Sequence, residues 1–425
     1  MRAKKIGAAM TLALALAAFD PASPRAADAP LTVSQLVEIA IEANPQVRSA
    51  RYRWDAAVHS IKQTVAPNDP VFTYTNSDSV KSPIGRAALR EFNVSESFQF
   101  PGKALHQRDQ AVRSAEIAHL ALVATVRDVR AATEMAYFQL VLDGALGSVN
   151  DDNVRNLDQV VRVAETAYSA SKVAQTDVIS AEFDLAAARQ LQRQYEIAIA
   201  NDQTTLNLLL YRPVGSPLSV DRTLRIEALN ARLDGLIDRA YAMRQEILEA
   251  ALAERNMNSA LYLAKMEYLP DFTVAVQYDD YLVPSFAPRL SQKRDWVGIV
   301  GFNMPIFFWL KQDEDVARAE ANLRAARSDL NLIKIQTAAA VANLFRSAQF
   351  AYESSILYRD SLIPLAQQNF RVALTAYQSG KIDFVTLSSI LQRNYVARIS
   401  YLQAANQFLA GEVSLEQAIG APLHQ

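Results

Sequence analysis

Few side chains in this 425-residue chain could perform covalent or metal-dependent chemistry. The sequence has no cysteine, which excludes disulfides, thiol catalysis, cysteine-ligated zinc and a lipid-modified N-terminal cysteine. It also lacks a GxSxG motif, a P-loop, an HExxH motif and a GxGxxG motif after a strand. None of the four histidines has HxxH spacing, so we interpret them as surface or packing residues: His59, His106, His119 and His424. We therefore expect no enzyme activity, no metal site and no cofactor.

Charge and composition exclude further classes. Lys plus Arg number 43 and Asp plus Glu number 45, so the chain lacks the basic excess that nucleic-acid binding requires. A hydrophobic content of 50% indicates a folded protein with a sizeable core. Only 12 glycines and 16 prolines are present, which favours long helices over a turn-rich β fold.

Two similar polar segments are the clearest candidates for function. Thr166-Ala-Tyr-Ser-Ala-Ser-Lys-Val173 resembles Thr375-Ala-Tyr-Gln-Ser-Gly-Lys-Ile382, and an aspartate follows each segment. The candidate residues are Tyr168, Lys172, Asp177, Tyr377, Gly380, Lys381 and Asp383. In one interpretation they contact neighbouring helices and a partner protein. In the other, the tyrosines only pack the turns and the charges are solvated.

The two segments belong to an internal duplication. Three other matches occur in the same order, with an offset near 200: Leu31–Asn44 with Ala231–Arg244, Pro70–Tyr74 with Pro270–Val274, and Phe98–Pro101 with Phe302–Pro305. Repeated similarity at a fixed offset indicates repeated structure. We predict repeat one over 31–212 and repeat two over 231–420, joined by a linker over Pro213–Leu233.

The N-terminus has the features of a secretory signal peptide. Arg2, Lys4 and Lys5 precede an apolar stretch from Ile6 to Phe19 that is too short to span a membrane. Small residues follow, and we place cleavage after Ala27. This predicts a signal peptide over 1–27 and an exported domain over 28–425. No later stretch is long and apolar enough for a transmembrane helix, so a membrane role would require strands or the protein surface.

Each repeat contains two segments with the alternation of β-strands. Apolar residues fall on one face, interrupted by Glu96, and polar residues such as Asn93, Ser95 and Gln277 on the other. The alternation fits a half-buried hairpin of a soluble sheet, or lipid-facing strands of a transmembrane barrel. In the second interpretation the lipid-facing residues are Phe92, Val94, Phe98, Val274, Val276 and Phe302.

Long helical segments distinguish these possibilities. Ile306–Ile363 and Ser148–Arg212 contain neither glycine nor proline. Apolar and small residues within Ile306–Ile363, and in a further segment over Val112–Leu140, follow the 3-4 spacing of a coiled coil. The two predicted stripes are Val112, Ala115, His119, Leu122, Val126, Val129, Thr133, Ala136 and Leu140, and Val316, Ala319, Leu323, Ala326, Leu330, Ile333, Thr337, Ala340, Leu344, Ser347 and Ala351. Four strands at one end of such a rod cannot close a barrel in lipid, but three copies supply twelve strands.

This combination resembles the TolC-type outer membrane factors over nearly all of Leu31–Gly420. The resemblance implies a mainly α fold with β: a homotrimer with a twelve-stranded barrel in outer-membrane lipid and a coiled-coil tunnel reaching into the periplasm. It also implies a passive channel that works with a periplasmic adaptor and an inner-membrane pump, here of the RND type. Phe98-Gln-Phe-Pro-Gly-Lys103 resembles the strand-to-helix turn of the CzcC-like heavy-metal branch.

In that family the turns near Ser169–Ala174 and Ser379–Asp383 would lie at the periplasmic tip. The resemblance implies that residues there close the tunnel and dock the adaptor. Many relatives carry an acidic constriction near the tip, and its candidate positions here are Asp177, Thr386 and Ser389. Two of these three are uncharged, which weakens the expectation of a cation-selective ring. The alternatives are a conduit for type I protein secretion and a soluble periplasmic coiled-coil rod.

Overall fold

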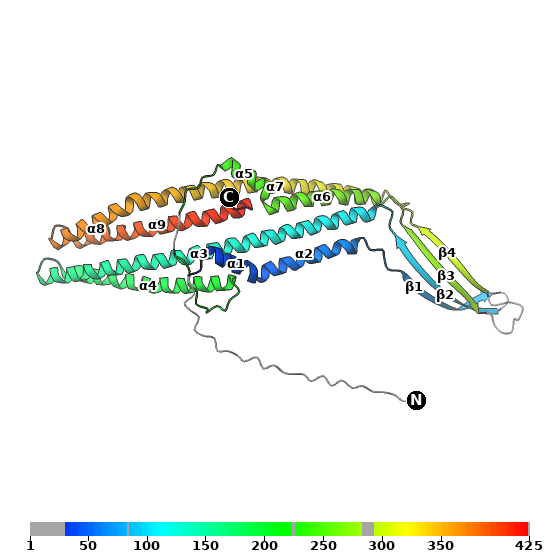
Figure 1. The fold of residues 1–425 in the computed structure, drawn as a ribbon, viewed down its shortest axis with the longest axis horizontal. Coiled ribbons are helices and arrows are strands. Elements are labelled where there is room, and N and C mark those ends of the chain that lie inside the picture. The colour runs from blue at the N-terminus through cyan, green and yellow to red at the C-terminus, as the bar shows by residue number, and fades with distance from the viewer. Residues whose placement is uncertain (1–29, 83–84, 223–225, 283–292, 424–425) are drawn as a thin grey trace, which may run out of the picture.

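The chain forms a long rod with a β-sheet at one end, as the computed structural model shows (Figure 1). The structure describes residues 30–82, 85–222, 226–282 and 293–423. The predicted signal peptide over 1–27 and His424 lie outside these described residues. Within the described residues, no helix is both long enough and apolar enough to cross a membrane.

Repeat one runs from two short helices through a strand pair into a long helical hairpin. Its elements are α1 (Val33–Ala43), α2 (Pro45–Thr64), β1 (Val71–Ser82), β2 (Gly85–Phe98), α3 (Lys103–Ser169) and α4 (Gln175–Leu209). Thr32 caps α1 in a capping box with Gln35, and Asn44 caps α2, which begins with Pro45. These local signals explain why the two helices are separate and meet at an angle.

Repeat two has the same order of elements. They are α5 (Leu233–Met243), α6 (Gln245–Met266), β3 (Phe272–Leu282), β4 (Lys293–Phe302), α7 (Gln312–Leu357), α8 (Ile363–Gln378) and α9 (Phe384–Ile419). A short π-helix, η1 (Tyr358–Leu362), joins α7 to α8. The prediction of helix from Ile306 was wrong at its start, because Ile306–Lys311 forms a turn and α7 begins at Gln312.

The helix also continues past Ile363, where the uninterrupted prediction ended. Pro364 has no N–H to donate to a preceding carbonyl, and its ring would clash inside a regular α-helix. The structure absorbs this with the π-helical turn, in which the Ile363 N–H donates to the carbonyl of Tyr358. A proline that usually ends a helix is therefore accommodated within a continuous one.

The four strands form one antiparallel sheet in the order β1-β2-β3-β4. Phe92 pairs with Tyr278, Val94 with Val276, and Phe98 with Phe272, so the apolar residues of both repeats share one face. The opposite face is mainly polar on the two central strands: Asn93 donates from its side chain to that of Gln277, and Ser97 and Thr273 share a hydrogen bond. Apolar residues on that face, among them Val297 and Ile299, lie on the edge strands. Strands β1 and β4 are the two edges, and within the described chain neither has a partner on its outer side.

The helical body is held by small and branched apolar residues on the predicted stripes. Ala115, Val129 and Leu140 of α3, and Ala319, Leu323 and Ala351 of α7, are buried. Two positions were predicted wrongly. Ser347 is exposed and Ala348 is buried instead, because the buried stripe of α7 moves one residue toward the C-terminus near Val341. His119 is exposed, with its ring against Trp54 of α2.

A buried lysine joins the sheet to the helices. Lys103, the first residue of α3, is only 2% exposed and forms ion pairs with Glu267 at 3.3 Å and Asp271 at 3.0 Å. Asp271 also accepts the N–H of Phe100. The preceding residue, Gly102, has φ +107°, a conformation that side chains rarely adopt. Lys103 belongs to repeat one and both acidic residues to repeat two, so this joint couples the two repeats at the base of the sheet.

Asp143 of α3 and Asp202 of α4 meet where these helices pack. Burial, together with the Asp143 carboxylate, raises the pKa of Asp202 to about 7. The folded protein therefore holds this proton more tightly than the unfolded chain, whose aspartate pKa is about 3.9. The contribution to stability is most favourable below that value and declines as the pH rises toward 7.

Replacing Asp202 with Asn should therefore raise the thermal unfolding midpoint at pH 8 by on the order of a few degrees and change it little at pH 4. Circular dichroism melts at both pH values measure this. Asp143→Asn should act in the same direction, and the exposed Asp151→Asn serves as the control. An equal shift at both pH values would show that the carboxylate pair is not its source.

Candidate functional site: the paired helical turns and the sheet

Both predicted turns lie at the end of the rod farthest from the sheet (Figure 1). The first joins α3 to α4 over 170–174, and the second joins α8 to α9 over 379–383. Their backbones form equivalent hydrogen bonds: the N–H of Lys172 donates to the carbonyl of Ala167 at 2.9 Å, and the N–H of Lys381 to that of Ala376 at 2.8 Å. Such a bond across five residues is how a helix ends around a left-handed residue.

The left-handed residue differs between the repeats. Gly380 has φ +70°, whereas Ser171 occupies the equivalent place with φ 55°. A residue with a Cβ is strained in this region and glycine is not. The left-handed conformation is therefore less strained in the second turn, at Gly380, than in the first, at Ser171.

The two turn tyrosines lie in different surroundings. Tyr377 is 1% exposed, and its ring packs edge-on against Phe384 with centroids 6.3 Å apart. Burial, with a smaller effect of the Asp177 carboxylate, raises the pKa of Tyr377. Tyr168 is 47% exposed. Tyr377 thus joins repeat two to the start of α4 in repeat one, while Tyr168 presents its ring to solvent.

The charged candidates divide in the same way. Asp383 is the N-cap of α9: it accepts the N–H of Thr386 at 2.8 Å, and contacts with Thr386 lower its pKa. Asp177 lies in the first turn of α4, where a negative charge interacts favourably with the helix N-terminus. Lys172 and Lys381 are exposed and form no ion pair within the described residues. Both lysines are therefore free to meet a partner.

The constriction candidates Thr386 and Ser389 are exposed on the first two turns of α9. The hydroxyl of Ser389 donates to the carbonyl of Thr386 at 2.9 Å. No described group of three or more histidine and acidic residues could hold a metal ion. The role of these residues in a constriction stays a prediction.

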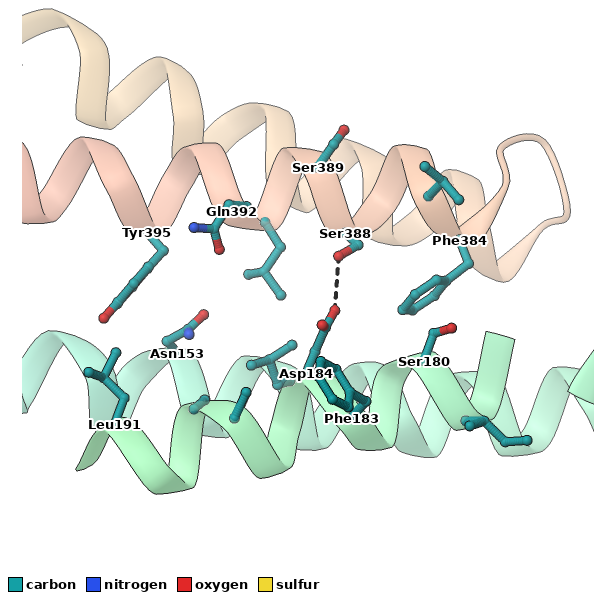
Figure 2. Close-up of a pocket in the computed structure, with 16 residues that line it drawn as sticks. Asn153, Ser180, Phe183, Asp184, Leu191, Phe384, Ser388, Ser389, Gln392 and Tyr395 are labelled. Atoms are coloured by element: carbon teal, nitrogen blue, oxygen red, sulfur yellow. Dashed lines mark hydrogen bonds between the residues drawn. The ribbon is translucent and has the colours of Figure 1, made fainter. Parts of the chain in front are cut away.

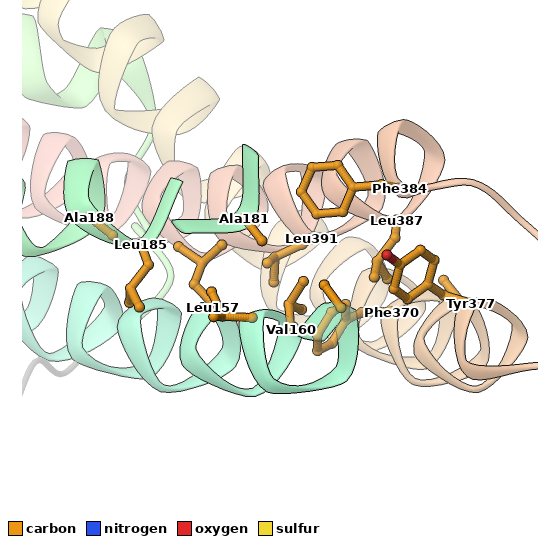
Figure 3. Packing of buried hydrophobic residues seen from close by; sticks show 13 residues of the cluster. Leu157, Val160, Ala181, Leu185, Ala188, Phe370, Tyr377, Phe384, Leu387 and Leu391 are labelled. Atoms are coloured by element: carbon orange, nitrogen blue, oxygen red, sulfur yellow. The ribbon is translucent and has the colours of Figure 1, made fainter. Parts of the chain in front are cut away.

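A hydrophobic cluster beneath the turns joins the two hairpins (Figure 3). Its members come from α3, α4, α8 and α9: Leu157, Val160, Val161, Ala164, Ala181, Leu185, Ala188, Phe370, Ala373, Tyr377, Phe384, Leu387 and Leu391. Residues of both repeats contribute, so the hairpins pack as one unit. The cluster fixes the two turns at the same level of the rod.

Sequence reasoning missed an open groove between α4 and α9, of about 910 Å³ (Figure 2). The hydroxyl of Ser388 donates across it to Asp184 at 3.0 Å. Ile179, Phe183 and Val385 at its edge are exposed apolar residues. Their signal in the sequence is weak, because isolated apolar residues on a polar helix face are common. The groove places apolar contacts directly beside the predicted tip residues.

The predicted strand residues lie together at the other end of the rod. Phe92, Val94, Phe98, Val274, Val276 and Phe302 are all exposed, and strand pairing places them on one face of the sheet. A soluble protein rarely exposes so large a contiguous apolar surface. The geometry therefore fits contact with lipid better than the alternative of a soluble half-buried hairpin.

This architecture occurs in solved structures. The outer-membrane channel OprN matches with a TM-score of 0.79 and 18% sequence identity, covering 92% of this chain and 91% of that chain. A sheet with one apolar face at the end of a rod of paired helical hairpins defines the class of TolC-type channels. The fold prediction is thus confirmed.

The sequence profile of the outer membrane efflux proteins matches residues 36–210 and 236–421, so the chain belongs to this family and is a protein of the outer membrane that extends into the periplasm. The cobalt-zinc-cadmium resistance protein CzcC of Cupriavidus metallidurans is 19% identical over 94% of this chain and 92% of its own length. The probable efflux pump outer membrane protein TtgC of Pseudomonas putida is 22% identical over 73% of this chain and 62% of its own length. Family membership removes the alternative of a soluble periplasmic rod.

The left-handed residue of the second turn gives a direct test of the local geometry. A Cβ added at Gly380 would have no atom within 4 Å, so Gly380→Ala should suffer only backbone strain, about 1–2 kcal/mol. Thermal or urea unfolding measures the loss. Gly215→Ala is the matched control, because it has equally open surroundings without the positive φ. Equal effects of the two substitutions would contradict the assigned turn geometry.

Proposed function

We propose that this protein is the outer-membrane channel of a tripartite efflux system and conducts its cargo passively as a homotrimer. One observation supports this most directly: a four-stranded sheet with two free edges and one exposed apolar face ends a long rod of paired hairpins. Unpaired backbone groups in lipid cost several kcal/mol each. Three copies remove every free edge if β4 of each pairs with β1 of the next.

The unequal tyrosines support the same assembly. The repeats correspond at an offset of 209 near the tip, so Tyr168 is equivalent to Tyr377 and Asp177 to Thr386. Tyr377 is buried against repeat one of its own chain. Within one chain, Tyr377 of repeat two packs near the start of α4 in repeat one. In a closed ring the same contact would form between chains, so the exposed Tyr168 would pack near the start of α9, close to Thr386, of the next protomer.

The adaptor and pump follow from the position of the tip. The chain contributes no nucleotide-binding motif, so transport energy would come from an inner-membrane pump, of the RND type, through a periplasmic adaptor. We propose that the adaptor's helical hairpin docks at the turns, using the exposed Lys172 and Lys381 and the apolar edge of the groove between α4 and α9. The two lysines would also contribute to contacts that keep the tunnel closed at rest.

The cargo class rests on the relatives. One is named for cobalt, zinc and cadmium resistance and another for toluene efflux. The wide sequence coverage of CzcC and the Phe98–Lys103 turn favour metal ions. A metal ion would be a substrate passing through the tunnel, and the described chain offers it no fixed site.

Reversing both tip lysines tests the mechanism. The combined variant Lys172→Glu and Lys381→Glu should fold and assemble, because exposed charges usually contribute only about 0–1 kcal/mol each. Native mass measurement in detergent should give three copies. In planar bilayers the variant should open more often than wild type, and in cells it should lose metal or drug resistance.

The matched control is Lys62→Glu with Lys265→Glu, which reverses two exposed lysines at the ends of α2 and α6, far from the tip. Wild-type conductance and resistance in the tip variant would refute the tip assignment. A stable monomer for the wild-type protein would refute the trimeric channel itself.

Replacing Val276 with Arg tests the lipid face of the sheet, because Val274 faces Glu96 across the strand pair and an Arg there would meet a carboxylate. Val276 lies near the middle of β3, with Val94 and Gly298 as its cross-strand neighbours, and a charge near the bilayer midplane should cost about 2–4 kcal/mol. The amount of trimer in isolated outer membranes should fall. The control is Gln277→Arg on the polar face of the same strand, which should insert normally. If Val276→Arg inserts as well as this control, the apolar face does not meet lipid.

A further inference from the structure

The two repeats differ in length between the strands and the long helices, and the proposed channel does not explain this difference. In repeat one, α3 begins at Lys103, two residues after Pro101. In repeat two, α7 begins at Gln312, seven residues after the equivalent Pro305. The five additional residues are Ile306-Phe-Phe-Trp-Leu310, all bulky and apolar. We name Ile306–Leu310 the apolar turn.

The apolar turn has a defined shape but covers no core. The N–H of Leu310 donates to the carbonyl of Phe307 at 3.0 Å, and the N–H of Asp313 to that of Phe308 at 2.9 Å. The ring of Trp309 packs edge-on against Phe307 and Phe308. Even so, all five side chains are exposed, and Trp309 is 53% exposed. Burial within this chain therefore does not account for five consecutive apolar residues.

The apolar turn continues the apolar face of the sheet. Three residues separate it from the end of β4, whose last residue, Phe302, lies on the same face as Val300 and Trp296. On its other side the sequence becomes charged at once, with Lys311 followed by Asp313, Glu314 and Asp315 in the first turn of α7. The turn thus marks a sharp boundary between an apolar strand face and a polar helix.

We propose that the apolar turn is a membrane anchor, which inserts Phe307, Phe308 and Trp309 into the headgroup region of the periplasmic leaflet of the outer membrane. Aromatic rings, tryptophan above all, concentrate at the level where hydrocarbon meets the headgroups. The turn lies at the level where the apolar face ends, and Lys311 next to it can reach lipid phosphates. The proposal rests on the proposed function, because it requires that the sheet face lipid.

The other possible occupant is the neighbouring protomer. In a closed barrel β4 would pair with β1 of the next copy, so the turn could also pack against that copy. The continuity with the apolar face favours lipid, since the opposite, polar face of the sheet would line the channel. Trp309 would be accessible to lipid if the turn inserts into the membrane, and shielded from lipid if the turn packs against the next protomer.

The chain has three tryptophans, Trp54, Trp296 and Trp309, which makes the test direct. Variants that keep one tryptophan and replace the other two with Phe are reconstituted as full-length trimers in phosphatidylcholine vesicles. Vesicles containing brominated phosphatidylcholine quench the fluorescence of a tryptophan that touches lipid. We expect Trp309 to lose at least half of its fluorescence, and more with bromines near the headgroup than near the chain ends.

The other tryptophans are the matched controls. Trp54 packs against His119 in the helical body and should remain unquenched, whereas Trp296 on the apolar face of β4 should be quenched. If Trp296 is quenched and Trp309 is not, the anchor is refuted and the channel stands. If Trp296 is also unquenched, the lipid face of the sheet fails, and the anchor fails with it.

Cysteine labelling provides an independent measurement should a tryptophan variant fold poorly. Because the sequence contains no cysteine, Trp309→Cys alone can carry an environment-sensitive fluorophore. Its emission should shift to shorter wavelength on reconstitution into vesicles and be quenched by lipid-bound nitroxide. Tyr168→Cys at the exposed tip is the control and should show neither change. A label at position 309 that behaves like the tip label would also refute the anchor.

Discussion

Backbone hydrogen bonding at the free edges of β1 and β4 is the constraint on which the rest of the structure depends. In water these edges would be solvated, but in lipid each unpaired group costs several kcal/mol. Four strands from one chain cannot close a ring, so the sheet is complete only as part of a larger barrel. The closure of the barrel also affects the helices, because the ion pairs of Lys103 with Glu267 and Asp271 connect the base of the sheet to α3 and α6. If several copies close the barrel around a symmetry axis, their helices must therefore be arranged around the same axis.

That coupling explains why the duplicated hairpins have matched lengths. The helix from Gln312 through η1 to Gln378 spans as many residues as α3 does, although it contains a proline that should interrupt it. If the two turns are to meet in one plane at the tip, a helix that ended early at Pro364 would leave a gap in the ring. The π-helical turn keeps the chain helical across that proline at the expense of regular hydrogen bonding. The hydrophobic cluster around Leu387 and Phe370 then locks the hairpins at the same level.

Periodicity predicted much of this from the sequence. Strand alternation identified the shared face of Phe92, Val94 and Val276, because a side chain in a strand can point only to one side or the other. The buried residues of the helices were predicted less accurately. Ser347 and Ala348 are both small, so the sequence does not show that the buried stripe shifts by one residue there. The environments of Tyr168 and Tyr377 could not be predicted at all. Their local sequences are nearly the same, and only the packing of one repeat on the other distinguishes them.

The differences between the repeats show where function allowed divergence. At the tip, a strained Ser171 stands opposite Gly380, and Asp383 caps a helix whose counterpart begins at an uncapped Ala174. At the base, repeat one has a short turn closed by buried Lys103, while repeat two has the exposed turn around Trp309. Between these ends the paired helices have nearly equal lengths, and the main difference is the π-helical turn before Pro364 in repeat two. In the proposed trimer the two repeats would alternate around a ring, and their surfaces differ most at the membrane boundary and at the tip. Divergence concentrated at the two ends fits the proposed channel, whose wall would be built from equivalent repeats and whose ends would meet different surroundings.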